Sequence, residues 1–270
     1  KLPEGVGSLK SSKNVNRVFS KIGYSLESIH SGNYNVPRLF LTSMPDDMDA
    51  IHESENRKSL FCLLVLPLIL QVNEEILKDR TRILRLKDQL DKKVLLNPID
   101  RLWLLVIAEG YKVESDDLEL LAKRVDIIPP SLALAQAAEE SGWGTSHFVK
   151  RGNAIFGEWT NFRGNGIVPR NRDVGKTHKV RSFTSLIASV RAYAKNLNTH
   201  RAYDKMRELR AAMRVQGRSL SSLKLSNKLS AYSQRGESYV KTLQSIIKIN
   251  KLWRLDKAGL KRLKKVRSLI

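Results

Sequence analysis

The eight residues from Ser131 to Ala138 carry no charge, and nearly all of them are small or apolar. Pro129 and Pro130 precede this run, and proline fits well in the first turn of a helix. A helix without a charged face is normally buried on all sides. The rest of the chain must therefore surround this segment, which favours a mainly helical globular body.

Two carboxylates, Glu139 and Glu140, follow the uncharged run, and Gly142 is typical of a left-handed helix C-terminus. A carboxyl group at the end of a buried helix loses hydration, which raises its pKa and suits a general acid. Hydrolysis of a glycosidic bond requires such an acid. Trp143 adds a flat indole of the kind that stacks on sugar rings. The alternative interpretation is a surface pair of glutamates beside a core tryptophan.

Helical periodicity extends on both sides of this segment. It predicts helices from about residue 55 to 93 and again after residue 184, and Asn97-Pro98 is typical of a helix start. Residues 150–178 contain five glycines and three aromatic residues, which predicts a loop-rich lobe with short strands. The apolar run Leu60–Leu70 is too short to span a bilayer and indicates a buried helix.

The charge of the chain points to an anionic partner. With 48 Lys+Arg and 27 Asp+Glu, the formal net charge is +21, which suits nucleic acid, a membrane surface or a wall polymer. The single cysteine, Cys62, excludes an intramolecular disulfide, and the five histidines lie far apart, so we predict no metal site and no cofactor. Nucleotide-binding and acyl-transfer motifs are absent from the sequence.

Two motifs at a fixed spacing narrow the function further. Residues 136–144 read Q-A-A-E-E-S-G-W-G, and residues 152–157 read G-N-A-I-F-G. Together they resemble the bacterial N-acetylglucosaminidase domain family, whose signature is A-x-E-S-G-W-G followed by N-L-F-G. Residues 196–203 and 232–239 are similar to its Bax-type subgroup. The resemblance covers about residues 125–250.

This resemblance implies a mainly α (α+β), lysozyme-like domain with a small β-lobe across a cleft. It implies hydrolysis of peptidoglycan glycan strands after N-acetylglucosamine. The general-acid role falls to Glu140, directly before S-G-W-G, and Glu139 receives no catalytic role. Tyr232 is the best match to a tyrosine near the family's cleft and is expected to be catalytic. The residues expected to bind substrate are Gln136, Trp143, Asn153, Phe156 and Tyr239.

The second catalytic carboxylate is open at this stage. Many members of the family carry one in the β-lobe, where Asp173 is the first candidate. Glu158 lies earlier than the family pattern, and Glu237 lies in a late loop. Asp173 is equally explained as an ion-pair partner of the arginines beside it, and the N-acetyl group of the substrate is a further alternative. Trp159 fits either a sugar-binding wall or packing of the lobe.

The pattern predicts four segments along the chain. Residues 1–54 are expected to form a flexible N-terminal arm and an irregular lead-in, since they show little periodicity. Residues 55–124 are expected to form a helical extension, and 125–250 the catalytic domain. Residues 251–270 are predicted to form a basic tail that contacts an anionic membrane or wall surface.

A second functional hypothesis uses the same fold. The uncertain second carboxylate and the net charge also suit a catalytically weak, cationic protein that binds cell wall or nucleic acid. No nucleic-acid-binding motif is present, so nucleic acid is not expected as a partner. Since peptidoglycan lies outside the inner membrane, the first hypothesis predicts a periplasmic or envelope-associated bacterial protein.

Overall fold

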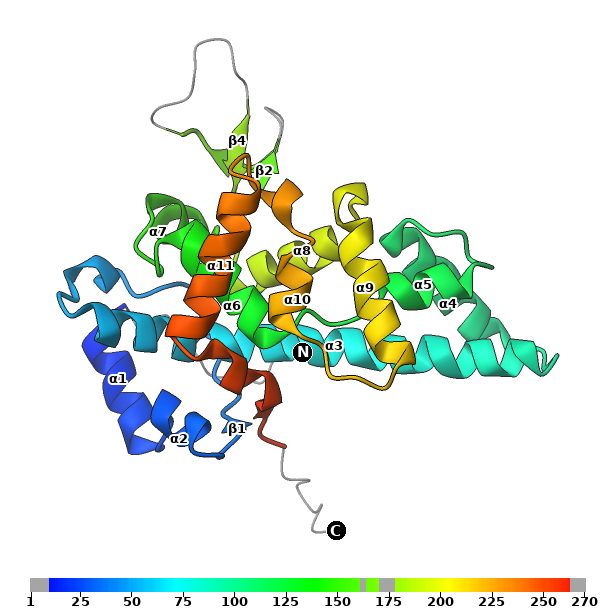
Figure 1. The fold of residues 1–270 in the computed structure, drawn as a ribbon, viewed down its shortest axis with the longest axis horizontal. Helices are drawn as coiled ribbons and strands as arrows, with labels where there is room; N and C mark the ends of the chain where they lie inside the picture. Colours follow the sequence, from blue (N-terminus) through cyan, green and yellow to red (C-terminus); the bar gives the residue numbers. More distant parts are fainter. Residues whose placement is uncertain (1–9, 161–163, 170–177, 263–270) are drawn as a thin grey trace.

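The computed structural model describes residues 10–160, 164–169 and 178–262, and it is mainly helical with two small sheets (Figure 1). The predicted α+β class with a small β-lobe is confirmed. The first half contains α3 (Ser54–Asp91), α4 (Pro98–Tyr111), α5 (Leu118–Arg124), α6 (Pro130–Ser141) and α7 (His147–Gly152). The second half contains α8 (Leu186–Thr199), η2 (Arg201–Tyr203), α9 (Asp204–Val215), α10 (Ser222–Ser226), η3 (Ser230–Tyr232), α11 (Glu237–Ile249) and η4 (Leu252–Lys257).

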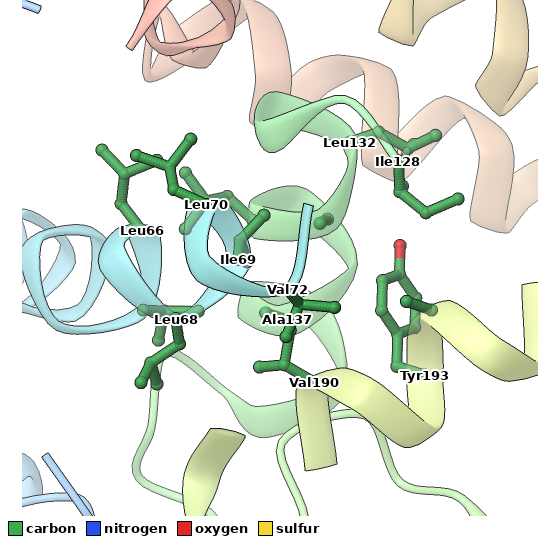
Figure 2. Close-up of a cluster of buried hydrophobic side chains, with 14 of the residues drawn as sticks. Leu66, Leu68, Ile69, Leu70, Val72, Ile128, Leu132, Ala137, Val190 and Tyr193 are labelled. Carbon is green, nitrogen blue, oxygen red and sulfur yellow. The ribbon is translucent and has the colours of Figure 1, made fainter. Parts of the chain in front are cut away.

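The uncharged helix α6 lies at the centre of the molecule, as its composition predicts. It packs against α3, α10, α11 and η4, and every residue from Pro130 to Ala138 is buried. Side chains of α3, α6 and α8 meet in this core, as Figure 2 shows for Val72, Ala137 and Val190. The helix that carries the candidate acid therefore has a rigid surround.

The long helix α3 forms the floor of the core. An 18-residue window of α3 has a mean hydropathy of 1.9, yet 78% of that window is buried inside the fold, as expected of a core helix rather than a membrane span. Pro67 lies inside α3 and has no N–H to donate to the carbonyl of Leu63. The hydroxyl of Tyr24 donates to that carbonyl instead, at 3.1 Å. The buried carbonyl is thereby satisfied.

The N-terminal segment is folded, so the prediction of a flexible arm is wrong for the residues described. α1 (Ser12–Lys21) and α2 (Leu26–His30) bury Val15, Phe19 and Ile29 against the core, and η1 (Met48–Ala50) follows. Although the segment as a whole shows little periodicity, Val15, Val18, Phe19 and Ile22 have the spacing of one helix face, and of these Val15 and Phe19 are buried while Ile22 is 51% exposed. The predicted domain boundaries themselves stay a prediction.

The C-terminal segment also packs into the fold as far as the structure describes it. β5 (Gly259–Leu260) pairs in parallel with β1 (Asn35–Val36), and Leu252 and Leu255 of η4 are buried. Asp256 accepts hydrogen bonds from the backbone N–H and the hydroxyl of Ser131, at 2.8 and 2.7 Å, and so caps α6. The predicted tail therefore begins with a structural element, and residues 263–270 lie outside the described residues.

The β-lobe is a three-stranded antiparallel sheet. Its central strand β4 (Lys179–Arg181) pairs with β2 (Trp159–Thr160) on one side and with β3 (Gly166–Ile167) on the other. The register places Trp159 opposite Val180. The sheet lies at one edge of the helical body, beside α7 and α11 in Figure 1.

Candidate active site

Glu140 lies at the end of α6 because the helix stops directly after it. Gly142, Trp143 and Gly144 all have positive φ, at 57°, 57° and 82°. The Ser141 hydroxyl accepts from the backbone N–H of Gly144 at 2.9 Å and fixes this turn. The turn exposes the last residues of an otherwise buried helix, and Glu140 is only partly buried.

A cavity of about 770 Å³ opens beside Glu140. One wall comes from the β-lobe, the floor from α8, and the far end from the C-terminus of α4. Its charged and aromatic lining residues are Lys112, Glu140, Phe156, Glu158, Trp159, Arg181, Arg191, Lys195, Tyr203 and Tyr232. Two carboxyls and four cations thus share one cavity.

The environment of Glu140 favours its protonated form. Burial raises the pKa of Glu140, a hydrogen bond from Tyr239 lowers it, and the charge of Glu139 raises it further. Glu139 itself pairs with Arg235, whose charge acts in the opposite direction on Glu140. The net direction is upward, which suits a proton donor.

Glu158 is the second carboxyl in the cavity, although it lies earlier in the sequence than the family pattern places a second catalytic carboxylate. Gly157, directly before it, has φ of 61°, and a Cβ added there would lie 3.6 Å from Oε2 of Glu140. The chain therefore passes close to the candidate acid just before it enters β2. The backbone N–H of Arg181 donates to the carbonyl of Glu158 at 2.7 Å and holds this segment on the sheet.

The carboxyl of Glu158 is poorly neutralised. Its side chain is 13% exposed, and Nη1 of Arg181 lies 3.4 Å from Oε2. Oε1 is buried, and no described residue hydrogen-bonds to it. Burial raises the pKa of Glu158 to about 7, against the charge and hydrogen bond of Arg181. Such a group changes protonation state near neutral pH.

Gln136 does not bind substrate directly, because its side chain is fully buried. It accepts from the hydroxyl of Tyr193 at 2.8 Å and donates to the hydroxyl of Tyr239 at 3.0 Å. Tyr239 is also buried and hydrogen-bonds to Glu140. These three residues form a chain of hydrogen bonds that ends on the candidate acid, so Gln136 and Tyr239 position Glu140.

The aromatic residues Tyr232, Phe156 and Tyr203 line the cavity next to Glu140. Tyr232 stacks parallel to Tyr239, with ring centroids 5.6 Å apart, and its hydroxyl donates to the carbonyl of Phe156 at 3.3 Å. The Phe156 ring stacks on Tyr193 at 3.8 Å. The pKa of Tyr203 is raised by burial and also by the charges of both Glu140 and Glu158. Tyr203 therefore lies within electrostatic reach of both carboxyls.

Two residues expected to bind substrate have structural roles. Trp143 is absent from the cavity lining and packs edge-on against Phe61 of α3, with ring centroids 5.8 Å apart. Asn153 has φ of 52° at the end of α7 and donates to the carbonyl of Phe183 at 3.2 Å. Trp159, by contrast, lines the cavity and is 63% exposed, so the sugar-binding interpretation suits it.

The other candidate carboxylates contribute less. Asp173 lies outside the described residues. Glu237 is exposed in the first turn of α11 and is not part of the cavity lining. Within the described ranges, no group of three or more His, Cys, Asp or Glu side chains could hold a metal ion.

Comparison with known proteins gives matches over most of the chain. Residues 115–252 match the glucosaminidase family, described as mannosyl-glycoprotein endo-beta-N-acetylglucosaminidase. The protein bax of Escherichia coli (strain K12) is 32% identical over 229 residues, which are 83% of this chain and 76% of that protein. The catalytic domain of the autolysin Auto from Listeria monocytogenes aligns with 63% of this chain and 96% of its own, at 19% identity and a TM-score of 0.37.

Proposed function

Because the chain belongs to the glucosaminidase family, in the subgroup that contains the protein bax of Escherichia coli, we propose that it hydrolyses peptidoglycan glycan strands after N-acetylglucosamine. The observation that carries this proposal is the Glu140 carboxyl, which has a raised pKa and faces a cavity lined by aromatic and charged side chains. The activity would be that of an endo-β-N-acetylglucosaminidase.

In this mechanism Glu140 is the general acid. Its proton passes to the glycosidic oxygen while the bond from that oxygen to the anomeric carbon breaks, and the bonding electrons stay on the leaving oxygen. Burial of Glu140 keeps the proton available, and the hydrogen bond from Tyr239 orients the carboxyl. Tyr232 and Phe156 shape the wall beside it and bind the sugar without transferring a proton.

We propose Glu158 as the second carboxyl, in preference to Asp173. The Glu158 carboxylate accepts a proton from a water molecule, whose oxygen forms the new bond to the anomeric carbon. Afterwards Glu158 releases that proton to solvent and Glu140 takes up one proton, which restores both carboxyls to their starting states. Asp173 stays the alternative, and Asp173→Asn compared with Glu158→Gln distinguishes the two.

The experiment is a digest of purified peptidoglycan followed by mass analysis of the released reducing ends. The wild type should release fragments that end in N-acetylglucosamine. Glu140→Gln should keep the fold and lose activity by about 10³-fold or more, since it removes the proton donor. Glu139→Gln is the matched control, because Glu139 is the adjacent carboxylate and pairs with Arg235. Full activity in Glu140→Gln would contradict the assignment.

The same digest tests the alternative of a cationic wall-binding protein. Binding to peptidoglycan without new reducing ends, weakened steeply by salt, would favour that alternative. The cations of the cavity, Lys112, Arg181 and Arg191, suit the carboxylates of peptide stems in either case. Since the proposed substrate lies outside the inner membrane, we expect a periplasmic or envelope-associated protein. Contact of the basic C-terminal segment with a membrane is likewise a proposal.

A further inference from the structure

The outward face of α4 is apolar, although nothing in the described structure covers it. Its five aliphatic side chains, with the preceding Leu95 included, form what we name the α4 stripe: Leu95 (95% exposed), Ile99 (75%), Leu102 (64%), Leu105 (54%) and Val106 (62%). The opposite face of α4 buries Leu104, Ala108 and Tyr111 in the core. Large contiguous apolar patches on a folded protein mark interaction sites.

The spacing within the stripe is that of a helix that packs against another helix. Ile99, Leu102 and Val106 are separated by three and four residues, which places them on one face of α4, and Leu95 lies in the turn that precedes the helix. α4 lies at the end of the molecule, beside the C-terminal part of α3, so a partner can approach it (Figure 1). The stripe therefore suits a helical partner.

We propose that two copies of this chain associate through the α4 stripe, with the two α4 helices antiparallel about a two-fold axis. Antiparallel pairing with Ile99 opposite Leu102 of the partner subunit also brings Val106 toward the turn before the partner's α4, which carries the partner's Leu95. All layers of the contact are then aliphatic, and a single surface serves both chains, as a two-fold interface requires.

The charges at the two ends of the stripe agree with this register. Glu109 follows Val106 by three residues on the same face, and Lys92 and Lys93 precede Leu95. In the antiparallel pair, Glu109 at the C-terminal end of one α4 lies toward the turn before the other α4, which carries the partner's Lys93; Lys92 already pairs with Asp88 of its own chain. Glu109 and Lys93 are exposed, and neither forms an ion pair with a described residue. Each is thus available to the other chain.

A lipid surface fits the stripe less well than a second copy. Interfacial helices typically place aromatic residues at the membrane boundary. The α4 stripe is purely aliphatic, since Trp103 turns toward Arg82, whose guanidinium carbon lies 4.3 Å from the ring centroid. Glu109 would also have to lie against anionic headgroups. In a protein pair, the same residue gains a cation.

The small area that two α4 helices can bury determines how strong a dimer we expect. A helix of 14 residues is about 21 Å long, so the pair buries less than the roughly 800 Å² per partner of a standard interface. The net charge of +21 adds repulsion between copies, which salt screens. The dimer should therefore be weak, concentration-dependent and stronger at high salt. Binding to an anionic surface would show the opposite dependence on salt.

Sedimentation velocity of the full chain over a range of concentrations tests the proposal. The wild type should shift from monomer to dimer as concentration rises, and the shift should begin at a lower concentration in high salt. Leu102→Glu should abolish dimerisation without loss of thermal stability, because its side chain is exposed. Val215→Glu and Ile249→Glu are matched controls, since both side chains are exposed on other helices and should leave dimerisation unchanged.

Disulfide trapping tests the register. The native Cys62 is buried, and burial raises the pKa of its thiol to about 12, so only introduced cysteines should react. A mixture of Ile99→Cys and Leu102→Cys chains should form the mixed disulfide faster than either chain forms its own. Faster self-pairing of Leu102→Cys would contradict the antiparallel register.

Two results would overturn the proposal as a whole. One is a wild type that stays monomeric at every concentration and salt. The other is a monomer that binds phosphatidylglycerol vesicles and loses that binding in Leu102→Glu, which would assign the stripe to lipid. These outcomes are independent of the peptidoglycan digest, because α4 carries no proposed catalytic residue.

Discussion

Two groups of charged side chains in the described structure, the Asp126 cluster and the cavity carboxyls, are built in opposite ways. The Asp126 cluster, beneath α9, consists of Asp126 with Arg80, Arg210 and Arg214. Arg214 donates to both carboxylate oxygens of Asp126, at 2.8 and 3.0 Å. The fully buried Arg210 donates to the backbone carbonyls of residues 123, 124, 126 and 127. Nearly every polar atom of this cluster has a partner.

The cavity carboxyls Glu140 and Glu158 lack such neutralisation. Burial acts to raise the pKa of Asp126, but the hydrogen bonds of Arg214 and the charges of Arg210 and Arg80 lower it overall. The pKa of Glu158 instead rises to about 7, because one Arg181 does not offset the burial of the carboxyl. A carboxylate whose charge is fully balanced by arginines, such as Asp126, is suited to a structural role. A buried carboxyl whose charge is only partly balanced, such as Glu158, can exchange protons.

The largest expected effect on stability is that of Arg210→Met. The substitution removes the donor from several buried carbonyls and a cation from beside Asp126, so the free energy of unfolding should fall by about 3–5 kcal/mol. Urea denaturation measures it. Lys87→Met is the control, since it removes only an exposed pair with Asp91 and should leave the urea midpoint almost unchanged. Similar losses in both variants would break the comparison.

Glu158→Gln should reduce kcat/KM by about 10²-fold with little change in stability. In the wild type, the proposed reaction needs a protonated Glu140 and a deprotonated Glu158, so the two carboxyls together must hold one proton. The higher of their two pKa values is about 7, so the pair loses its last proton near pH 7. Activity should therefore fall as pH rises through about 7. In Glu158→Gln the residual activity depends on Glu140 alone, so this alkaline limb should move to lower pH. An unchanged limb would exclude Glu158 from the titration.

The smallest expected effect is that of Tyr239→Phe. The hydrogen bond from Tyr239 lowers the pKa of Glu140, so its removal should raise that pKa and move the acid limb of kcat/KM to higher pH. Stability should fall by about 1 kcal/mol. Tyr24→Phe also deletes one buried tyrosine hydroxyl, which donates to Leu63 far from the cavity. This control should lose similar stability, and a shift of its pH profile would show that the effect is not specific.

Local signals in the sequence are sufficient to predict the central helix α6 and its candidate acid Glu140. The uncharged run predicts the burial of α6, and Gly142 predicts its end, so Glu140 was found without any knowledge of distant contacts. The long helix predicted for residues 55–93 is α3, at Ser54–Asp91. Each of these features depends on residues that are neighbours in the chain.

Features that depend on distant residues could not be predicted. Trp143 was expected beside a sugar, but three consecutive positive φ angles direct its ring to Phe61 of α3. The sequence makes Asp173 the first candidate for the second carboxyl, whereas the turn at Gly157 and the short strand β2 bring Glu158 into the cavity. The folded N-terminal segment depends on β1 pairing with β5, more than 200 residues away. A single sequence carries no signal for such partners.

The cap on α6 has a consequence for how the protein is made. Asp256, which caps Ser131, is synthesised 125 residues after it. Tyr239, which hydrogen-bonds to Glu140, also leaves the ribosome roughly 100 residues after the acid. A nascent chain can therefore display the complete E-S-G-W-G motif while the candidate acid Glu140 is still unsupported. The proposed hydrolysis would therefore require translation past η4, and a chain truncated before that point should carry the motif without activity.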